Sequence, residues 1–363
     1  MKASKRRRIR QILVGAARYD AITQVALEIR WLCGSDHETE VFSWFAPDSS
    51  VAESISHISA CGDGDPDDVL VYHLSYGIPE LTQWLLCRPE RLIIWYHNVT
   101  PAHFYETIDS QFASGLAHGR QEIETLRERC DLAVTVSDFN ASELRDFGYV
   151  NVRVARPSST ATRLRHVGAS SRMIHELQQR FPSGFVLAVS QVLPHKRADF
   201  AVEVSHLLRD YHGLDVGLVW AGPIRLPRYK SALEELIHRL NSTSIWFTDA
   251  VGEAELAALY RACTCFISVS EHEGLSIPPL EAMECGAPVV VRGAAAIPET
   301  VGDGAIVVPP EWGVIGFAEV VAEVCRKPEL RRDLRVAGRH WLETGRSDNS
   351  LTSVMEIIVE LVR

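Results

Sequence analysis

Short apolar runs alternate with helical patterns along the whole chain, and this alternation limits the possible folds more than any other feature of the sequence. The runs are apolar throughout, as in "QILVGA" and "FVLAVSQV", rather than at every second residue. A strand of this kind is buried on both faces, which is typical of a parallel sheet covered by helices on both sides. The expected strands begin near residues 11, 39, 68, 91, 132 and 150 in the first half and near 185, 216, 244, 263, 287 and 304 in the second.

These two series of strands predict an α/β fold with two doubly wound, Rossmann-like domains. A chain of 363 residues is also too long for one ordinary hydrophobic core. The stretch "RPSSTATRLRHVGASS" between the series is polar and has no apolar period, so it marks the join. We therefore expect one domain over residues 1–165, a second over 166–345, and an amphipathic helix in the final segment, 346–363.

The charge distribution bears on the class of partner. The net charge of -10 argues against nucleic acid as the main partner. The start of the chain is basic although the chain as a whole is acidic, because "KASKRRRIR" at residues 2–10 carries six Lys or Arg residues. This segment is either a solvated tail that leads into the first strand or a peripheral contact with an anionic membrane surface.

The sequence favours a cytoplasmic protein. No apolar run approaches the roughly 20 residues of a membrane-spanning helix, and the basic start leads into polar sequence rather than the apolar core of a signal peptide. None of the eight cysteines forms a C-x-x-C pair, and their spacing fits neither a disulfide framework nor a zinc site. Thiols without a framework are typical of a reducing compartment.

The stretch "EHEGLSIPPLEAMECG" follows an expected strand and opens a short helix at Pro278. Proline suits a first helical turn, and Gly286 suits a helix end. One interpretation is therefore a well-capped helix in which Ser276 is the N-cap. The other is an anion site, in which backbone N–H groups at the helix start bind phosphate. Glu273 and Glu281 would then lie beside the bound group, and their carboxylates would accept hydrogen bonds from its hydroxyl groups. This arrangement suits a nucleotide sugar.

Other candidates stand where expected strands end, since α/β sheets bind ligands beyond the carboxyl ends of their strands. His97 and Asn98 follow one strand, Lys196 follows another, and His73 ends a third. Each also has a simpler interpretation, as a structural strand-end residue or as a solvent-facing lysine before a helix. The turn "GAARYD" at residues 15–20 lacks the G-x-G-x-x-G pattern, so no dinucleotide cofactor is expected.

No metal site is expected. The acidic stretch "GDGDPDD" at residues 62–68 has Asp68 and Leu74 where a calcium-binding EF-hand loop needs Gly and Glu. The stretch "HEGLS" lacks the second His of the H-E-x-x-H zinc motif. An acidic turn before a strand is the better interpretation of the first stretch.

The residues from 271 to 310, "EHEGLSIPPLEAMECGAPVVVRGAAAIPETVGDGAIVVPP", resemble the donor-site signature of glycosyltransferase family 4, whose members are retaining enzymes with the GT-B fold. The resemblance covers about residues 185–345, through "VLAVSQVLPHKR", "WAGP" and "VGEAELAALYRAC". In the first half, "DAITQVALEIRWL", "WYHNVTP" and "AVTVSDFNASELRDFGY" resemble some of the family's bacterial members. The resemblance implies two Rossmann-like domains that face each other across a cleft, with the final helix crossing back to the first domain.

The resemblance also implies a role for each matching residue. Glu281 would hold the ribose hydroxyls, Glu273 would contact the donor sugar or face the reacting carbon, and Lys196 would neutralise the departing diphosphate. His97 would border the transferred sugar. The implied catalytic residues are His97, Lys196 and Glu273; the implied donor-binding residues are Gln191, Arg197, Gly274, Leu275, Ser276, Ile277 and Glu281; the implied acceptor-side residues are Tyr19, Asp20, His73 and Asn98.

Two departures from the family pattern bear on the donor site. The family usually has Gly-Arg where this chain has Ser190 and Gln191, so one positive charge is missing. Arg197, beside Lys196, is the candidate to replace it. Ser276 stands where the family commonly has Gly.

The resemblance implies a hexosyltransferase of polysaccharide or natural-product biosynthesis. Such an enzyme moves a sugar from a nucleoside diphosphate to a hydroxyl of a glycan, a lipid-linked glycan or a natural product, with retention and without a metal or other cofactor. A nucleotide-sugar 2-epimerase of the same fold is an alternative. A non-catalytic sugar-nucleotide-binding subunit is another alternative. Gln191 favours it, and the presence of the full set Glu273, Glu281, Lys196 and His97 opposes it.

Overall fold

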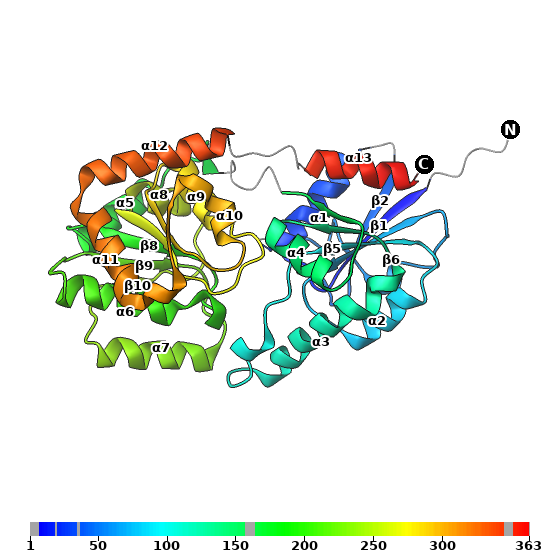
Figure 1. Cartoon of the computed structure of the whole chain (residues 1–363), viewed down its shortest axis with the longest axis horizontal. Helices are drawn as coiled ribbons and strands as arrows, with labels where there is room; N and C mark the ends of the chain where they lie inside the picture. The colour runs from blue at the N-terminus through cyan, green and yellow to red at the C-terminus, as the bar shows by residue number, and fades with distance from the viewer. Residues whose placement is uncertain (1–6, 19, 35–36, 157–163, 345–350, 363) are drawn as a thin grey trace. The chain divides into compact units, whose positions relative to one another are not determined.

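The computed structural model describes residues 7–18, 20–34, 37–156, 164–344 and 351–362. It divides into two compact units (Figure 1). Unit 1 comprises Met1–Pro157 and Asp348–Arg363, and unit 2 comprises Ser158–Ser347. The division comes earlier than residue 165, where the polar stretch predicts it, because Leu164 is fully buried in the core of unit 2.

Unit 1 contains a parallel sheet with the order β3-β2-β1-β4-β5-β6-β7. The order reverses between β1 and β4, as in doubly wound nucleotide-binding folds. The short strand β3 is the only described strand of this sheet that the sequence does not predict, since its two residues are exposed and form no apolar run. The strands are β1 (Arg8–Leu13), β2 (Glu38–Ser43), β3 (Ser56–His57), β4 (Val69–Leu74), β5 (Arg91–Tyr96), β6 (Cys130–Thr135) and β7 (Val152–Val154).

Unit 2 repeats the same topology. Its parallel sheet has the order β10-β9-β8-β11-β12-β13, which again reverses at the centre, here between β8 and β11. The two Rossmann-like sheets confirm the predicted fold class. The strands are β8 (Phe185–Val189), β9 (Gly217–Ala221), β10 (Ile245–Phe247), β11 (Cys265–Ser268), β12 (Val289–Arg292) and β13 (Ile306–Val308).

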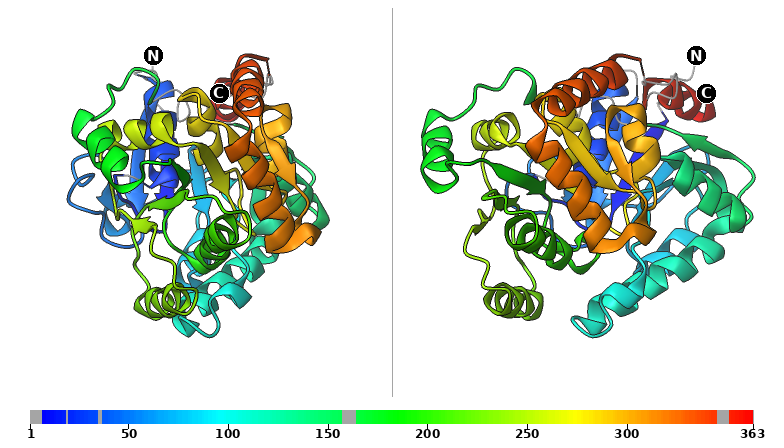
Figure 2. Two further views of the ribbon diagram at one scale, coloured as in Figure 1. Left: turned by 90° about the vertical axis from the view of Figure 1, so that its left-hand side faces the viewer. Right: turned by 60° about the vertical axis from the view of Figure 1, so that its left-hand side comes forward.

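Helices connect the strands of each sheet (Figures 1 and 2). Those of unit 1 are α1 (Ala21–Leu32), α2 (Pro79–Leu86), α3 (Ser110–Leu126), α4 (Asp138–Asp146) and α13 (Leu351–Val362). Those of unit 2 are α5 (Ser171–Arg180), α6 (Ala198–Asp210), α7 (Pro227–Arg239), α8 (Glu253–Ala262), α9 (Pro278–Glu284), α10 (Ile297–Val301), α11 (Gly313–Arg326) and α12 (Pro328–Thr344).

The last helix, α13, contributes to the core of unit 1 rather than that of unit 2. Its residues Val354, Met355 and Ile358 are buried against a cluster that includes Ile9 of β1 and Ile29 of α1. Figure 1 shows α13 beside α1. The apolar face of this amphipathic helix is thus covered, although the helix follows the last element of unit 2 in the chain.

Part of the basic start of the chain is internal. Arg10 lies in β1 with a side chain only 1% exposed, and its guanidinium pairs with Glu90 at 3.0 Å. Arg8 pairs with Asp68 at 3.1 Å. The basic surface predicted over residues 2–10 is therefore smaller than the sequence indicates, because a buried guanidinium needs a paired carboxylate and cannot also contact a membrane. Residues 2–6 lie outside the described residues.

One buried acid makes the stability of unit 1 depend on pH. Glu122 of α3 has no exposed surface and accepts hydrogen bonds from the hydroxyls of Thr82 at 2.7 Å and Tyr72 at 3.1 Å. Burial raises the pKa of Glu122 from 4.5 to about 7, and these hydrogen bonds offset the rise only in part. The folded chain therefore binds this proton more tightly than the unfolded chain. The stability that results is complete below about pH 4.5 and is lost as the pH rises through about 7.

We predict that Glu122→Gln flattens the pH dependence of unfolding between pH 5 and pH 8. The neutral amide keeps partners for both hydroxyls and has no proton to lose. Near pH 8 the free energy of unfolding of the variant should therefore exceed that of the parent by on the order of 2–3 kcal/mol. Urea unfolding at several pH values measures this. Glu124→Gln, an exposed change on the same helix, is the matched control. Parallel pH profiles for parent and Glu122→Gln would contradict the assignment.

Candidate active site

The loops that follow β8 and β11 meet at the point where the sheet of unit 2 reverses direction. Ligands of doubly wound sheets bind at such points, beyond the carboxyl ends of the strands. A pocket lies here, within unit 2. Its lining combines strand ends with loop residues from both sides of the reversal. The lining residues are Ala188, Val189, Ser190, Lys196, Trp220, Ile267, Ser268, Val269, Ser270, Glu273, Ser276 and Pro278.

An ion pair stands in this pocket. Lys196 ends the short 3₁₀ turn Pro194–Lys196 after β8, and Glu273 lies in the loop after β11. The lysine Nζ and the Glu273 Oε1 atoms are 2.6 Å apart, and the two side chains are 16% and 13% exposed. The structure thus brings together two residues that the sequence assigns to one site. Because both remain in contact with solvent, an incoming anion can compete for the ammonium group.

The backbone of the loop before α9 is strained. Ser276 has a φ of +69°, in the left-handed region, and its side chain is buried. This conformation costs an L-residue about 1–2 kcal/mol and costs glycine almost nothing, which accounts for the glycine that the family pattern favours here. The alternative that Ser276 caps the helix is wrong, because Ile277 occupies the N-cap position and no side chain caps this helix.

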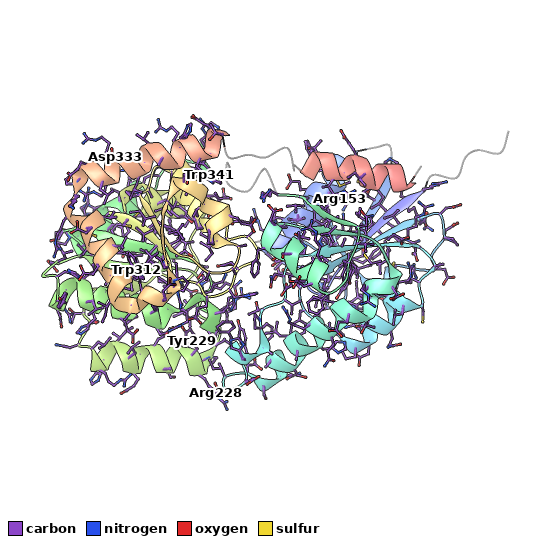
Figure 3. The ribbon with its side chains drawn as sticks, viewed as in Figure 1. Arg153, Arg228, Tyr229, Trp312, Asp333 and Trp341 are labelled. Carbon is purple, nitrogen blue, oxygen red and sulfur yellow. The ribbon has the colours of Figure 1, made fainter. Side chains whose placement is uncertain are left out.

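The same loop presents backbone donors. Within the part of the chain that the structure describes, the N–H groups of Leu275, Ser276 and Ile277 donate to no protein acceptor. Two contacts with the segment around α10 hold the loop, since the Thr300 hydroxyl donates to the Leu275 carbonyl at 2.5 Å and the Ala296 N–H donates to the Glu273 carbonyl at 3.3 Å. Trp341 of α12, labelled in Figure 3, donates in turn to the Thr300 carbonyl at 2.9 Å.

Glu281 is not among the residues that line the pocket. The side chain is 7% exposed, and its Oε2 atom accepts a hydrogen bond from the Tyr260 hydroxyl of α8 at 3.0 Å. Burial and the neighbouring carboxylate raise the pKa of Tyr260 well above its ordinary value, so the hydroxyl keeps its proton and remains a donor. The sequence gives no sign of this tyrosine, because α8 is an ordinary amphipathic helix.

Arg197 forms ion pairs with carboxylates that do not line the pocket. Its guanidinium pairs with Asp199 at 2.9 Å and with Glu271, and Arg292 of β12 shares the same Glu271 oxygen at 2.6 Å. Tyr229, labelled in Figure 3, donates to Asp199 at 2.9 Å. The structure therefore gives Arg197 a bridging role between loops. Gln191, at the position of the missing arginine, is exposed.

In unit 1, His97 is half-buried at the end of β5, and its Nε2 atom lies 2.9 Å from Nδ1 of His73. Burial lowers the pKa of His97 to about 3, and burial together with the neighbouring ring lowers that of His73 well below its ordinary value. Both rings are therefore neutral at physiological pH. The expectation that His73 lines an acceptor surface is wrong, because the ring has no exposed surface and lies within the sheet.

The other residues predicted on the acceptor side have local structural roles. Asp20 caps α1, accepting from the Thr23 N–H and hydroxyl at 2.8 Å each. Asn98 has a φ of +80°, and its buried side chain donates to Asn140 at 2.8 Å. Tyr19 lies outside the described residues. Across the described ranges, no three His, Cys, Asp or Glu side chains gather in a way that could hold a metal ion, and no helix is long and apolar enough to cross a bilayer.

The chain has the two-unit architecture of the GT-B fold. The solved structure of WaaG, a glycosyltransferase involved in lipopolysaccharide biosynthesis, superposes with a TM-score of 0.70 over 98% of this chain and 99% of its own, at 13% identity. Residues 175–341 match the family model "Glycosyl transferases group 1". The matched residues lie within unit 2 and include Lys196 and Glu273.

Curated relatives support the same class. O-antigen chain mannosyltransferase B of Escherichia coli is 29% identical over 61% of this chain and 58% of its own length. The GDP-mannose-dependent alpha-(1-6)-phosphatidylinositol monomannoside mannosyltransferase of Mycolicibacterium smegmatis is 28% identical over 43% of this chain and 42% of its own. The matched part of this chain thus spans less than two thirds of each of these relatives.

We predict that Glu281→Ala destabilises the protein by about 1–3 kcal/mol, because it leaves the buried Tyr260 hydroxyl without this acceptor. Tyr260→Phe in the same chain removes the stranded donor, so the double variant recovers part of the loss. Urea unfolding of the parent, both single variants and the double variant forms a complete cycle. Strictly additive free energies of unfolding would contradict the interaction.

Proposed function

We propose that this chain is a glycosyltransferase that moves a mannosyl group from GDP-mannose to a hydroxyl of a glycan or a glycan-bearing lipid, with retention. The observation that carries the proposal is the Lys196–Glu273 pair, which lies in a pocket at the reversal of the unit 2 sheet beside three backbone N–H donors. An ammonium group and clustered N–H groups suit a diphosphate, and the carboxylate suits sugar hydroxyls.

The choice of mannose and of guanosine diphosphate rests on the relatives. The two relatives described above are mannosyltransferases by name, and one is named as GDP-mannose-dependent. Retention rests on the resemblance to family 4. The N-terminal unit would take the acceptor, as the family resemblance implies, and His97 would border the transferred sugar.

In the proposed reaction, the acceptor oxygen bonds to the anomeric carbon of the sugar as the bond from that carbon to the diphosphate breaks. The acceptor proton passes to the leaving diphosphate, which departs on the same face. Lys196 would stabilise the charge that develops on the diphosphate, and the N–H groups of residues 275–277 would donate to the same group. We propose that these donors make a divalent metal unnecessary.

Incubation with GDP-mannose and with UDP and dTDP sugars tests the function. We expect release of GDP from GDP-mannose, faster with a mannan-type acceptor and unchanged by EDTA. Complete loss of release in EDTA, restored by Mg²⁺ or Mn²⁺, would contradict the metal-free mechanism. A change in the sugar without release of nucleotide would identify an epimerase instead. Binding of a donor without turnover would indicate a non-catalytic sugar-nucleotide-binding subunit, and the absence of both binding and turnover with all of these donors would contradict the proposed function.

We further predict opposite effects of the two pocket residues on the binding of GDP. Lys196→Ala removes the cation and should weaken GDP binding by about 1.5–3 kcal/mol. Glu273→Gln removes the carboxylate that competes for the ammonium, so GDP should bind at least as tightly as to the parent, while sugar transfer falls.

Calorimetric titration of GDP measures both effects. Lys230→Ala and Glu234→Gln are matched controls, since these residues form an exposed ion pair on α7 in the same unit. If Glu273→Gln weakens GDP binding as strongly as Lys196→Ala does, the two side chains do not compete in the way that we propose.

A further inference from the structure

A chain of hydrogen bonds runs through the interior of unit 1 to His97. Gln11 of β1 donates from Nε2 to the Ala26 carbonyl of α1 at 2.8 Å. The Oε1 atom of Gln11 lies 3.0 Å from His73 Nε2, and His73 Nδ1 lies 2.9 Å from His97 Nε2. Gln11 and His73 have no exposed surface. This polar chain crosses a sheet interior that is otherwise built from residues such as Ile9, Val69 and Ile93.

The two ends of the chain determine where each proton lies. A carbonyl can only accept, so the group of Gln11 that faces Ala26 is the amide NH₂, and Gln11 presents its oxygen to His73. His73 must then donate from Nε2. Neutral His73 has no proton left for Nδ1, which accepts from His97 Nε2. Neutral His97 therefore carries its proton on Nε2 and leaves Nδ1 as an acceptor.

Protonation would reverse the character of His97 Nδ1. If the extra proton goes to His97, both of its nitrogens carry protons. If it goes to His73, then His73 Nδ1 becomes the donor to His97 Nε2, and the proton of neutral His97 moves to Nδ1. Either way, Nδ1 becomes a donor. The pair thus presents an acceptor when neutral and a donor when it holds one additional proton.

The groups around the pair keep it neutral. Burial lowers the pKa of both rings, and the charge of His97 lowers that of His73 further. No carboxylate among the described residues acts on either ring. Gln11 on β1 is uncharged, and Trp95 on β5 stacks on His73 with ring centroids 6.0 Å apart. Within the described residues, Nδ1 of His97 has no hydrogen-bond partner.

We propose that Gln11 and His73 are positioning residues, which hold His97 with an unprotonated Nδ1 so that it accepts a hydrogen bond from a hydroxyl of the substrate at neutral pH. The identity of that hydroxyl, as part of a sugar, rests on the proposed function. The tautomer does not rest on it, because the tautomer follows from the contacts within unit 1. A hydrophobic residue in place of Gln11 or His73 would serve the sheet equally well if the two had only a packing role.

Nitrogen NMR of the full chain labelled in histidine tests the tautomer without any substrate. The signals of His97 are assigned by their loss in His97→Gln. We expect a protonated Nε2 and an unprotonated Nδ1 between pH 6 and pH 8. In His73→Leu, Nε2 loses its partner, and we expect a mixture of tautomers. A protonated Nδ1 in the parent, or an unchanged spectrum of His97 in His73→Leu, would overturn the proposal.

The pH dependence of turnover is the second test. Gln11→Glu places a carboxylate beside His73, which favours the protonated pair, so the acidic limb of the kcat profile should move upward by about one pH unit or more. Gln24→Glu is the matched control, since Gln24 is exposed on α1 in the same unit. His73→Leu should lower kcat by about tenfold or more, with little change in the KM for the donor. An acidic limb that stays in place in folded Gln11→Glu would overturn the proposal.

The two tests separate this proposal from the proposed function. If the NMR signals show the expected tautomer and no sugar donor is turned over, the positioning chain stands and the glycosyltransferase assignment fails. If transfer occurs and Nδ1 carries a proton, the assignment stands and the positioning chain fails. Should Gln11→Glu fail to fold, the His73→Leu spectrum and its kcat decide.

Discussion

The sheet of unit 2 reverses its winding between β8 and β11, and the candidate donor site depends on this reversal. Because the two strands are hydrogen-bonded neighbours, the loops that follow them diverge from a shared edge. Lys196 comes from one loop and Glu273 from the other, and they meet at 2.6 Å. Gly222, which follows the neighbouring strand β9, allows a close approach, since a Cβ there would lie 1.9 Å from the Ser190 carbonyl oxygen. A side chain at this position would displace the loop that carries Lys196.

The guanidinium groups near this edge of the sheet are held by carboxylates outside the pocket lining, whereas Lys196 lies in the lining itself. Arg197 and Arg292 bind Glu271, and Arg197 also binds Asp199, so these guanidinium groups tie loops together. Lys196 is the cation in the pocket lining, and its partner is itself a candidate contact for the sugar. In a mostly buried ion pair of this kind, the cost of desolvating both charges offsets much of their attraction, so the net contribution to stability is small. If Lys196 left Glu273 to bind a diphosphate, the fold would therefore lose little stability. This suits a site that binds and releases its ligand.

The sequence predicts the strands of both sheets well, because continuous apolar runs are a local signal of a doubly covered sheet. The resemblance to family 4 also assigns Lys196 and Glu273 to one donor site, and the two side chains lie 2.6 Å apart in the structure. Prediction from sequence fails where a contact joins distant elements without a local pattern. Tyr260 belongs to an amphipathic helix, and nothing nearby in the sequence indicates its bond to Glu281. Gln11 has the appearance of the polar start of an apolar run, although it lies fully buried within β1.

A crystal structure of the full chain with GDP bound would show whether the pocket at the reversal of the unit 2 sheet is the donor site. We expect the diphosphate to lie within hydrogen-bonding distance of Lys196 Nζ and of the N–H groups of residues 275–277, with Lys196 separated from Glu273. A diphosphate bound elsewhere on the molecule, or one bound here while Lys196 and Glu273 stay paired and out of its reach, would contradict the assignment of this pocket as the donor site.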